Sequence, residues 1–184
     1  MKLLARRQFL ALPVGLFFLG GNGFGATQAK ERRAPRGSHV LFVCTGNFYR
    51  SRFAEAIFKA HATTGALTAN SRGLDTSKPR DTGLSPLVVA ELKRLKVSAD
   101  LVAGYPRQLK REDLDAADVV VLLDGREHAP MLHKQFPQAD MTKVRQWSVP
   151  DVPAMAASDA FAEITRQVDL LVAELAARAS LQGK

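Results

Sequence analysis

Hydrophobic residues along the chain follow two patterns, one typical of strands and the other typical of helices. Continuous apolar runs at 40–43 and within 118–124 are typical of strands buried on both faces of a sheet. Weaker strand patterns cover 67–71 and 144–149. We therefore predict a strand at each of these four positions.

Apolar residues between the strands recur at helical spacing. Helices are predicted from Ser51, from Ser85, over 125–135 and from Ser158. The segments 71–85 and 150–155 are rich in turn-forming residues and are predicted to be loops. Because strands alternate with helices, the pattern predicts an α/β fold in which a mostly parallel sheet is covered by helices on both faces. Ligands bind such sheets at the carboxyl ends of the strands, and Cys44 stands at the end of the first one.

The composition is that of an ordinary globular domain, with 46% hydrophobic and 24% charged residues in a chain of 184. Most of the net charge of +8 lies before position 38. The rest of the chain has no basic stripe interleaved with aromatic residues, which argues against a nucleic-acid-binding module. The single cysteine, Cys44, makes neither an internal disulfide nor a cysteine-based zinc site. The four histidines are scattered, so no metal site is predicted.

The segment 1–29 has the three parts of a secretory signal: a basic start, an apolar middle and small residues at its end. The apolar middle is shorter than the ~20 residues of a membrane-spanning helix, so we expect no stable membrane anchor after signal removal. Residues 6–10, RRQFL, resemble the core of a twin-arginine signal, and the general secretion route stays open. Cleavage near Ala29 leaves a basic linker at 30–37 and a domain at 38–184, in the periplasm or outside the cell.

The stretch from Cys44 to Ser51 has the properties of an anion-binding loop. It ends where a helix is predicted to begin, and the N–H groups and dipole of a helix N-terminus favour an anion. Gly46 and Asn47 tolerate the left-handed conformation that turns successive N–H groups inward. Arg50 adds a planar fork that can hold two oxygens of a phosphate-like group. A C-x5-R spacing alone is a weak signal, but its position between a buried strand and a helix predicts an oxyanion site.

The same positive surroundings are expected to lower the pKa of the Cys44 thiol and favour the thiolate, which is the nucleophilic form. Ser51 is placed to donate its hydroxyl to the sulfur. A buried, inert cysteine is the alternative interpretation. The loop around Cys44 favours the nucleophile.

At these residues the chain resembles the low-molecular-weight protein tyrosine phosphatases and their arsenate-reductase relatives, whose loop has the form C-x-G-N-x-x-R-S. The resemblance extends over about residues 39–155 and implies a four-stranded parallel sheet with helices on both sides. It assigns catalysis to Cys44 and Arg50. The residues that it assigns to phosphate binding are Thr45, Gly46, Asn47, Phe48, Tyr49 and Ser51. No cofactor is expected, because Arg50 and the backbone supply the positive field.

Thiolate attack on a phosphomonoester expels an alkoxide or phenoxide, which a carboxylic acid must protonate. The family resembled carries this acid in an Asp-Pro pair on a late loop. Asp151 stands at the matching place, although Val152 separates it from Pro153. A solvated loop acid or a helix cap is the alternative for Asp151. Asp124 is a second candidate acid, for which a helix cap is favoured.

Other departures from the family pattern bear on specificity. Arg52 replaces the frequent proline after the loop serine, and it either favours acidic substrates or, the favoured interpretation, is a solvated helix residue. Tyr49 stands where some members have a second cysteine, and Ala154 and Met155 replace the paired tyrosines. Phe48 either forms an apolar wall of the site or packs inward.

The leading prediction is a phosphomonoesterase that acts on a phosphomonoester or phosphoprotein through a cysteinyl-phosphate. An arsenate reductase is one alternative, and because Cys44 is the only cysteine, it would need an external thiol. The other alternative is a binding module for an oxyanion or a phosphoprotein that does not turn its ligand over.

Overall fold

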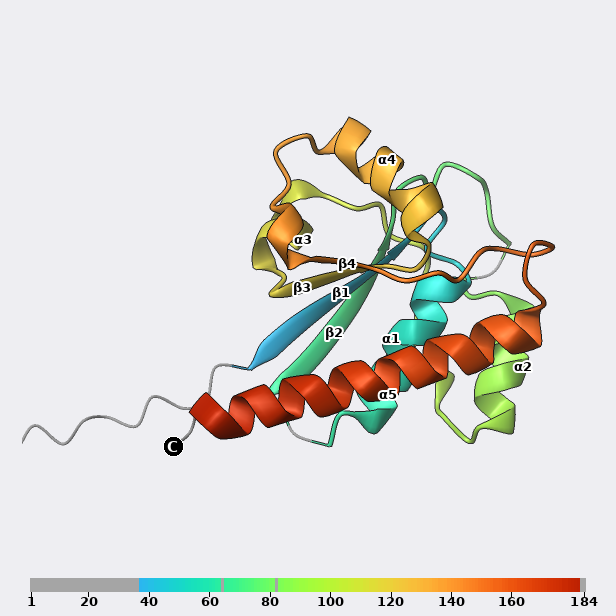
Figure 1. Cartoon of the computed structure of the whole chain (residues 1–184). Coiled ribbons are helices and arrows are strands. Elements are labelled where there is room, and N and C mark those ends of the chain that lie inside the picture. The colour runs from blue at the N-terminus through green and yellow to red at the C-terminus, as the bar shows by residue number, and fades with distance from the viewer. Residues whose placement is uncertain (1–36, 64, 82, 183–184) are drawn as a thin grey trace, which may run out of the picture. The chain divides into compact units, whose positions relative to one another are not determined.

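Four parallel strands form one sheet in the order β2-β1-β3-β4 in the computed structural model, which describes residues 37–63, 65–81 and 83–182 (Figure 1). The strands are β1 (Ser38–Cys44), β2 (Leu67–Gly73), β3 (Val119–Leu122) and β4 (Val144–Gln146). All four lie where the hydrophobic pattern predicts a strand. β4 is shorter than predicted, but the N–H groups of Trp147 and Val149 still donate to carbonyl groups at the end of β3.

The helices that cover the sheet are α1 (Arg50–His61), α2 (Pro86–Arg94), α3 (Arg111–Ala116), α4 (Gly125–Gln135) and α5 (Ala157–Gln182). Two short 3-10 helices, η1 (Ala99–Val102) and η2 (Met141–Lys143), complete the described elements. The starts of α1 and α5 lie one residue from the predicted positions. α3 was not predicted, because it is short and buries only Leu114, so its sequence carries no apolar stripe.

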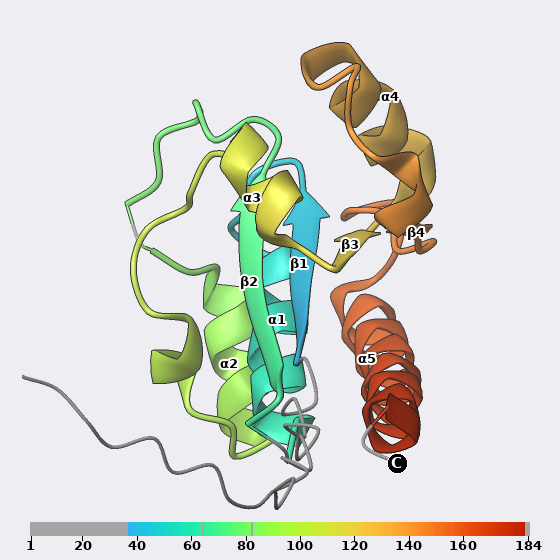
Figure 2. The ribbon, with the colours of Figure 1, turned by 90° about the vertical axis from the view of Figure 1, so that its left-hand side faces the viewer.

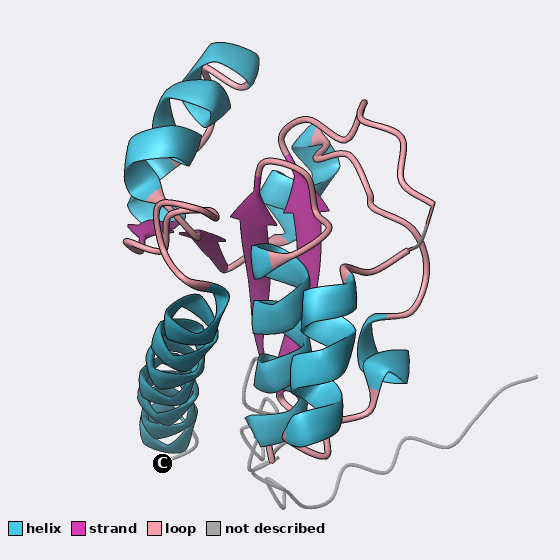
Figure 3. Ribbon diagram, turned by 90° about the vertical axis from the view of Figure 1, so that its right-hand side faces the viewer, coloured by secondary structure: helices cyan, strands magenta, loops and turns pink. Residues whose placement is uncertain are grey.

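Side chains of the central strands alternate between the two faces of the sheet. Val40 and Phe42 of β1 pack in a large core with α1, α2 and α5, whereas Leu41 and Val43 pack in a smaller core with α3 and α4. Figure 1 shows α3 and α4 on one side of the strands and α1, α2 and α5 on the other, and Figures 2 and 3 show the same elements turned by 90° to either side. The prediction of an α/β fold with a parallel sheet covered on both faces is confirmed.

The predicted export signal and most of the predicted linker lie outside the described residues. All of the described residues belong to one of the two units into which the chain divides, Arg32–Lys184. Among the helices described between 37 and 182, none is long and apolar enough to cross a bilayer.

The carboxyl ends of the strands bring together segments that are distant in sequence. β1 ends at Cys44, which lies opposite Gly73 at the end of β2. α1 begins six residues after Cys44, and α4 begins shortly after β3. The chain leaving β4 passes this same edge, because the backbone of Trp147 accepts a hydrogen bond of 2.9 Å from Gly125 at the start of α4. The candidate site is built here, as expected for a parallel sheet.

Candidate active site

The segment that joins β1 to α1, residues 44–51 and hereafter the Cys44 loop, turns its carbonyl groups toward neighbouring segments. The carbonyl oxygens of Cys44, Thr45 and Phe48 accept hydrogen bonds of 3.0, 2.8 and 3.0 Å from N–H groups outside the loop. By contrast, no backbone N–H of residues 45–49 donates a hydrogen bond to any described part of the chain. These donors are available to an anion beside a helix N-terminus.

Asn47 braces the loop. It is fully buried, and its φ of +47° is left-handed. Such a conformation was predicted for Gly46 or Asn47, and only Asn47 adopts it. Its Nδ2 donates to Ser51 Oγ at 3.1 Å and Ser71 Oγ at 2.8 Å, and its Oδ1 accepts the N–H of Arg107 at 2.8 Å. The Asn47 side chain therefore stabilises the conformation of the loop, and both its amide nitrogen and its amide oxygen are hydrogen-bonded to protein groups.

Cys44 lies at the base of the loop with 3% of its surface exposed. Its Sγ is 3.0 Å from Ser51 Oγ, so the predicted contact between the sulfur and the serine hydroxyl is present. Because Asn47 donates to the same Ser51 oxygen, the hydroxyl hydrogen is left to point toward the sulfur. The serine hydroxyl therefore faces the sulfur that the sequence predicts as the nucleophile.

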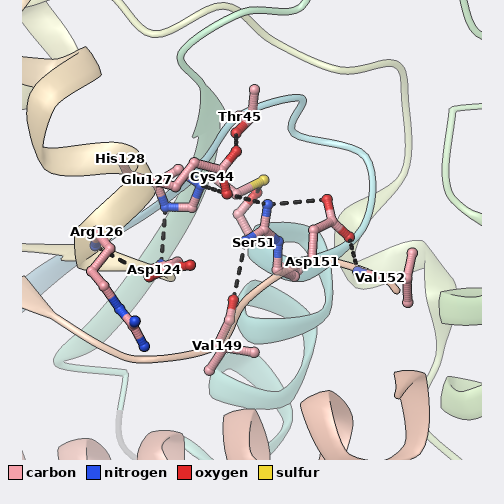
Figure 4. Close-up of polar contacts among 11 residues, drawn as sticks. Cys44, Thr45, Ser51, Asp124, Arg126, Glu127, His128, Val149, Asp151 and Val152 are labelled. Carbon is pink, nitrogen blue, oxygen red and sulfur yellow. Dashed lines mark hydrogen bonds and ion pairs between the residues drawn. The ribbon is translucent and has the colours of Figure 1, made fainter. Parts of the chain in front are cut away.

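Arg50 is 1% exposed, and oxygen atoms from three residues hold its guanidinium group. Nη1 donates to the Val149 carbonyl at 3.0 Å. Nη2 donates to Asp151 Oδ2 and Glu127 Oε2, each at 3.0 Å (Figure 4). The second oxygen of Asp151 accepts the N–H of Val152 at 2.9 Å. The structure therefore brings the predicted acid to the predicted anion-binding arginine, 101 positions away in sequence.

Glu127 is a member of this network that sequence reasoning missed. It accepts hydrogen bonds from the Thr45 hydroxyl and from Arg50. Burial opposes its ionisation, but the Thr45 hydrogen bond and the Arg50 charge outweigh burial, so the pKa of Glu127 is below its ordinary value. A glutamate in the first turn of a helix is usually a solvated, dipole-favoured residue. The sequence around Glu127 therefore gave no signal of its contact with the loop.

His128, the next residue, is fully buried beneath Glu127. Burial and the nearby charge of Arg50 lower the pKa of His128 to about 4. Its Nδ1 accepts the Asp124 N–H at 3.0 Å, which assigns the hydrogen of the neutral ring to Nε2. Nε2 lies 3.3 Å from Glu127 Oε2 but is too poorly aligned to form a hydrogen bond. His128 is thus a neutral support for this side of the site.

Cys44, Arg50 and Asp151 line one cavity of about 270 Å³. Its other walls include Gly46, Phe48, Tyr49, Arg80, Ser85, Leu87 and Val152. Phe48 forms an apolar wall, which is one of the two alternatives considered for it. The Arg80 guanidinium lies over the Phe48 ring, 4.4 Å from its centroid, and adds a cation to the cavity.

Tyr49 contributes its aromatic ring to the same cavity. The ring packs against Phe161 at 5.3 Å between centroids. Its hydroxyl is buried and has no hydrogen-bond partner among the described residues. Burial, reinforced by the negative charge of Asp151, raises the pKa of Tyr49 to about 12. The phenol therefore stays neutral at physiological pH.

Two residues singled out from the sequence lie elsewhere. Asp124 caps α4, where its carboxylate accepts the Arg126 N–H at 3.2 Å, and it is not among the described residues that line the cavity. The cap interpretation of Asp124 is thus supported. Arg52 was expected to be solvated, and this was wrong: only 2% of it is exposed, and it lines a different cavity. Its side chain turns back toward η1, where Val102 and Gly104 accept its hydrogen bonds.

Within residues 37–63, 65–81 and 83–182, no group of three or more His, Cys, Asp and Glu side chains is arranged to hold a metal ion. The positive charge at the Cys44 loop comes from Arg50, Arg80 and the backbone N–H groups.

The fold and the site together define a class: α/β domains in which the first strand of a parallel sheet runs into a cysteine-bearing oxyanion loop at a helix N-terminus. Residues 39–184 match the low molecular weight phosphotyrosine protein phosphatase family, and the chain belongs to this family.

Three relatives illustrate the similarity. The chain is 30% identical over 97 residues to a protein-arginine-phosphatase of Bacillus subtilis (strain 168), with 53% of this chain and 62% of the relative covered. It is 34% identical over 93 residues to the low molecular weight protein-tyrosine-phosphatase YfkJ of the same strain, covering 47% and 56%. The chain thus spans less than two thirds of each of these two relatives. The structure of a low molecular weight protein tyrosine phosphatase from T. tengcongensis superposes with a TM-score of 0.64 at 28% identity, covering 75% of this chain and 99% of that one.

Proposed function

We propose that the chain is a phosphomonoesterase that works through a cysteinyl-phosphate on Cys44. The observation that carries this proposal is the single cavity lined by Cys44, Arg50 and Asp151. It combines a nucleophile, an anion-binding arginine and a carboxyl group that can exchange a proton with solvent, because the Asp151 side chain is 49% exposed. These are the three groups that cleavage of a phosphate ester by a thiolate requires.

In the first step the Cys44 sulfur attacks phosphorus, and the P–O bond to the leaving group breaks. Arg50 and the N–H groups of residues 45–49 hold the non-bridging oxygens, where charge is spread in the transition state. Asp151 gives its proton to the leaving oxygen. In the second step Asp151 takes a proton from water, the water oxygen attacks phosphorus, and the S–P bond breaks. Phosphate is released, and both Cys44 and Asp151 return to their starting states.

The contacts of Arg50 explain how substrate binding would prepare the acid. Nη2 of Arg50 donates to Asp151 Oδ2 at 3.0 Å, and a phosphoryl oxygen held by the same nitrogen would displace this carboxylate oxygen. The displaced carboxyl group would then be free to turn toward the leaving oxygen. Binding of the phosphoryl group thus releases the acid from Arg50. Glu127 keeps Arg50 in place while Asp151 is released.

The cavity walls favour a phenol as the leaving group, and therefore an aryl phosphate as the substrate. Phe48, Leu87 and Val152 offer apolar surface beside the phosphoryl site. Arg80, over the ring of Phe48, would repel a cationic guanidinium leaving group but not a phenol. We therefore propose phosphotyrosine, ahead of phosphoarginine, as the side chain on which the enzyme acts.

The test is hydrolysis of a chromogenic aryl phosphate, and of matched phosphotyrosine and phosphoarginine peptides, by the full chain. We expect turnover by the wild type, none by Cys44→Ser, and faster turnover of the phosphotyrosine peptide. Hydrolysis that survives Cys44→Ser would refute the mechanism. Tight phosphate binding without turnover of any of the three compounds would identify a binding module, and arsenate-dependent oxidation of an added thiol would identify a reductase.

We also propose that the enzyme is exported with removal of residues 1–29, on the strength of the basic, apolar and small-residue parts of that segment. The mass of the chain recovered from the producing cell, and the compartment that contains it, test this. Recovery of the uncleaved chain in the cytoplasm would contradict it.

A further inference from the structure

A second cavity, of about 230 Å³, lies beside Arg52, and it shares no lining residue with the Cys44 cavity. Its charged walls come from α1, β2, η1 and the segment that follows η1. The charged and hydroxyl side chains that line it are Arg52, Arg72, Arg107, Lys59, Glu55, Asp100 and Ser71. Neither the phosphatase mechanism nor the family resemblance uses this cavity.

Arg52 is the central residue of this cavity. It is 98% buried, since only 2% of its surface is exposed. One of its terminal nitrogens, Nη2, donates to the carbonyl groups of Val102 and Gly104. Its Nε is buried and has no hydrogen-bond partner within the described part of the chain. A buried donor without a partner is destabilising unless a ligand or water satisfies it.

Two carboxylates line the cavity against four cations. Glu55 accepts hydrogen bonds from Lys59 at 2.5 Å and from Ser71 at 2.6 Å, and Asp100 accepts one from Ser98 Oγ at 3.1 Å. Asp113, outside the cavity, holds Arg72 at 2.7 Å. The exposed side chain of Arg107 has no hydrogen bond or ion pair with any described residue. Positive charge therefore exceeds what the local acids neutralise.

The neighbouring cations also affect the pKa of Arg52. Burial lowers its pKa, and the charges of Arg107 and Arg72 lower it further, while Glu55 opposes them. An anion in the cavity would relieve both the repulsion among the arginines and the missing partner of Arg52 Nε.

We propose that this cavity binds a small tetrahedral oxyanion, such as inorganic phosphate or the phosphate group of a small ligand. Guanidinium groups present several N–H donors in a plane and match the oxygens of such an ion. Arg52 supplies a buried donor, and Arg107 supplies a free cation at the entrance. A volume of about 230 Å³ exceeds the roughly 30 Å³ that one water occupies in the liquid, so the ion fits with part of its hydration.

The site is connected to the Cys44 loop through Asn47. Ser71, which lines the cavity, accepts a hydrogen bond from Asn47 Nδ2, and the backbone N–H of Arg107 donates to Asn47 Oδ1. An ion held by the side chains of Arg52 and Arg107 would immobilise the segments that carry these contacts. The binding proposal itself is independent of whether Cys44 is catalytic.

The test is a titration of the ¹⁵N-labelled full chain with inorganic phosphate at constant ionic strength, followed by amide chemical shifts. The amides of Asn70 and Ala103 report on the second cavity, and those of Gly46 and Tyr49 report on the Cys44 cavity. We expect two saturable sets of shifts with different midpoints. Arg107→Gln removes an exposed charge without disturbing the core, and it should weaken the Asn70 and Ala103 response by about 10-fold or more.

Two further variants are titrated with phosphate in the same way. Arg52→Gln should abolish the Asn70 and Ala103 response, and Arg94→Gln is the matched control, because Arg94 is exposed, pairs with Glu91 and lines neither cavity. The control should leave both midpoints unchanged. The proposal is overturned if the Asn70 and Ala103 amides show no saturable shift. It is also overturned if Arg107→Gln leaves their midpoint unchanged, whatever the folding state of Arg52→Gln.

Discussion

Replacement of Asn47 by alanine should destabilise the chain strongly, although Asn47 lies in a loop. The side chain is fully buried and makes three hydrogen bonds, to Ser51, Ser71 and the backbone of Arg107. Its backbone has a φ of +47°, which asparagine tolerates and alanine does not. The substitution therefore removes a buried polar network and strains the backbone at the same position.

The magnitude follows from these contacts. Each hydrogen bond contributes about 1 kcal/mol net, and the left-handed conformation costs an alanine about 1–2 kcal/mol. We expect Asn47→Ala to lower the free energy of unfolding by about 4 kcal/mol. Against a typical domain stability of about 5–15 kcal/mol, this is a large loss from one loop position.

Urea unfolding, followed by the fluorescence of the single tryptophan, Trp147, measures this loss. Trp147 is buried and packs against Phe42 at 5.8 Å between ring centroids, so its emission should change on unfolding. Asn70→Ala is the matched control in phosphate-free buffer, because the Asn70 side chain makes no hydrogen bond to a described residue and should lose less than about 0.5 kcal/mol. A loss for Asn47→Ala no larger than that of the control would show that the network does not hold the loop.

Two further predictions concern ionisable groups. Asp151→Asn should lower kcat/KM, which reports the step in which the leaving group departs, by about 10²- to 10⁴-fold for an alkyl phosphate but less for a nitrophenyl phosphate, because nitrophenolate needs little protonation; an equal loss of kcat/KM for both would rule out Asp151 as the acid. His128 has a pKa of about 4 in the folded state against an ordinary value of 6.5. Since only the unfolded chain then takes up a proton at this site, stability should fall as the pH falls from about 6.5 to about 4. His128→Asn should flatten that part of the stability profile measured by urea unfolding, and an unchanged slope would contradict the assignment.

The parts of the site that lie within one continuous stretch were accessible from the sequence. The apolar run of β1 and the helical spacing of α1 fix where the strand ends and the helix begins. The Cys44 loop between them follows from these boundaries. Gly46 and Asn47 were equivalent candidates for the left-handed residue, and the buried partners of Asn47 decide between them. Two of those partners, Ser71 and Arg107, come from β2 and from the segment before α3, so no local pattern reveals them.

The contacts of Glu127 and Arg52 were beyond sequence reasoning. Both are charged residues near the start of a helix, a position that is usually solvated. Glu127 reaches Arg50 because α4 starts at the same edge of the sheet as α1, and this depends on strand order. Arg52 is buried because η1 offers it carbonyl oxygens, and η1 is too short to be predicted from a hydrophobic pattern. Asp151, by contrast, was singled out from its place in the family pattern, and the structure brings it into contact with Arg50.

The proposed mechanism requires a covalent bond between Cys44 and phosphorus. Acid quenching of the Asp151→Asn variant during turnover of an activated aryl phosphate, followed by peptide mass spectrometry, tests for this bond. Because Asp151 also activates the water, the variant should accumulate the intermediate, and we predict one phosphoryl group on Cys44. Steady turnover with no phosphoryl group on Cys44 at any time point would contradict the proposed mechanism.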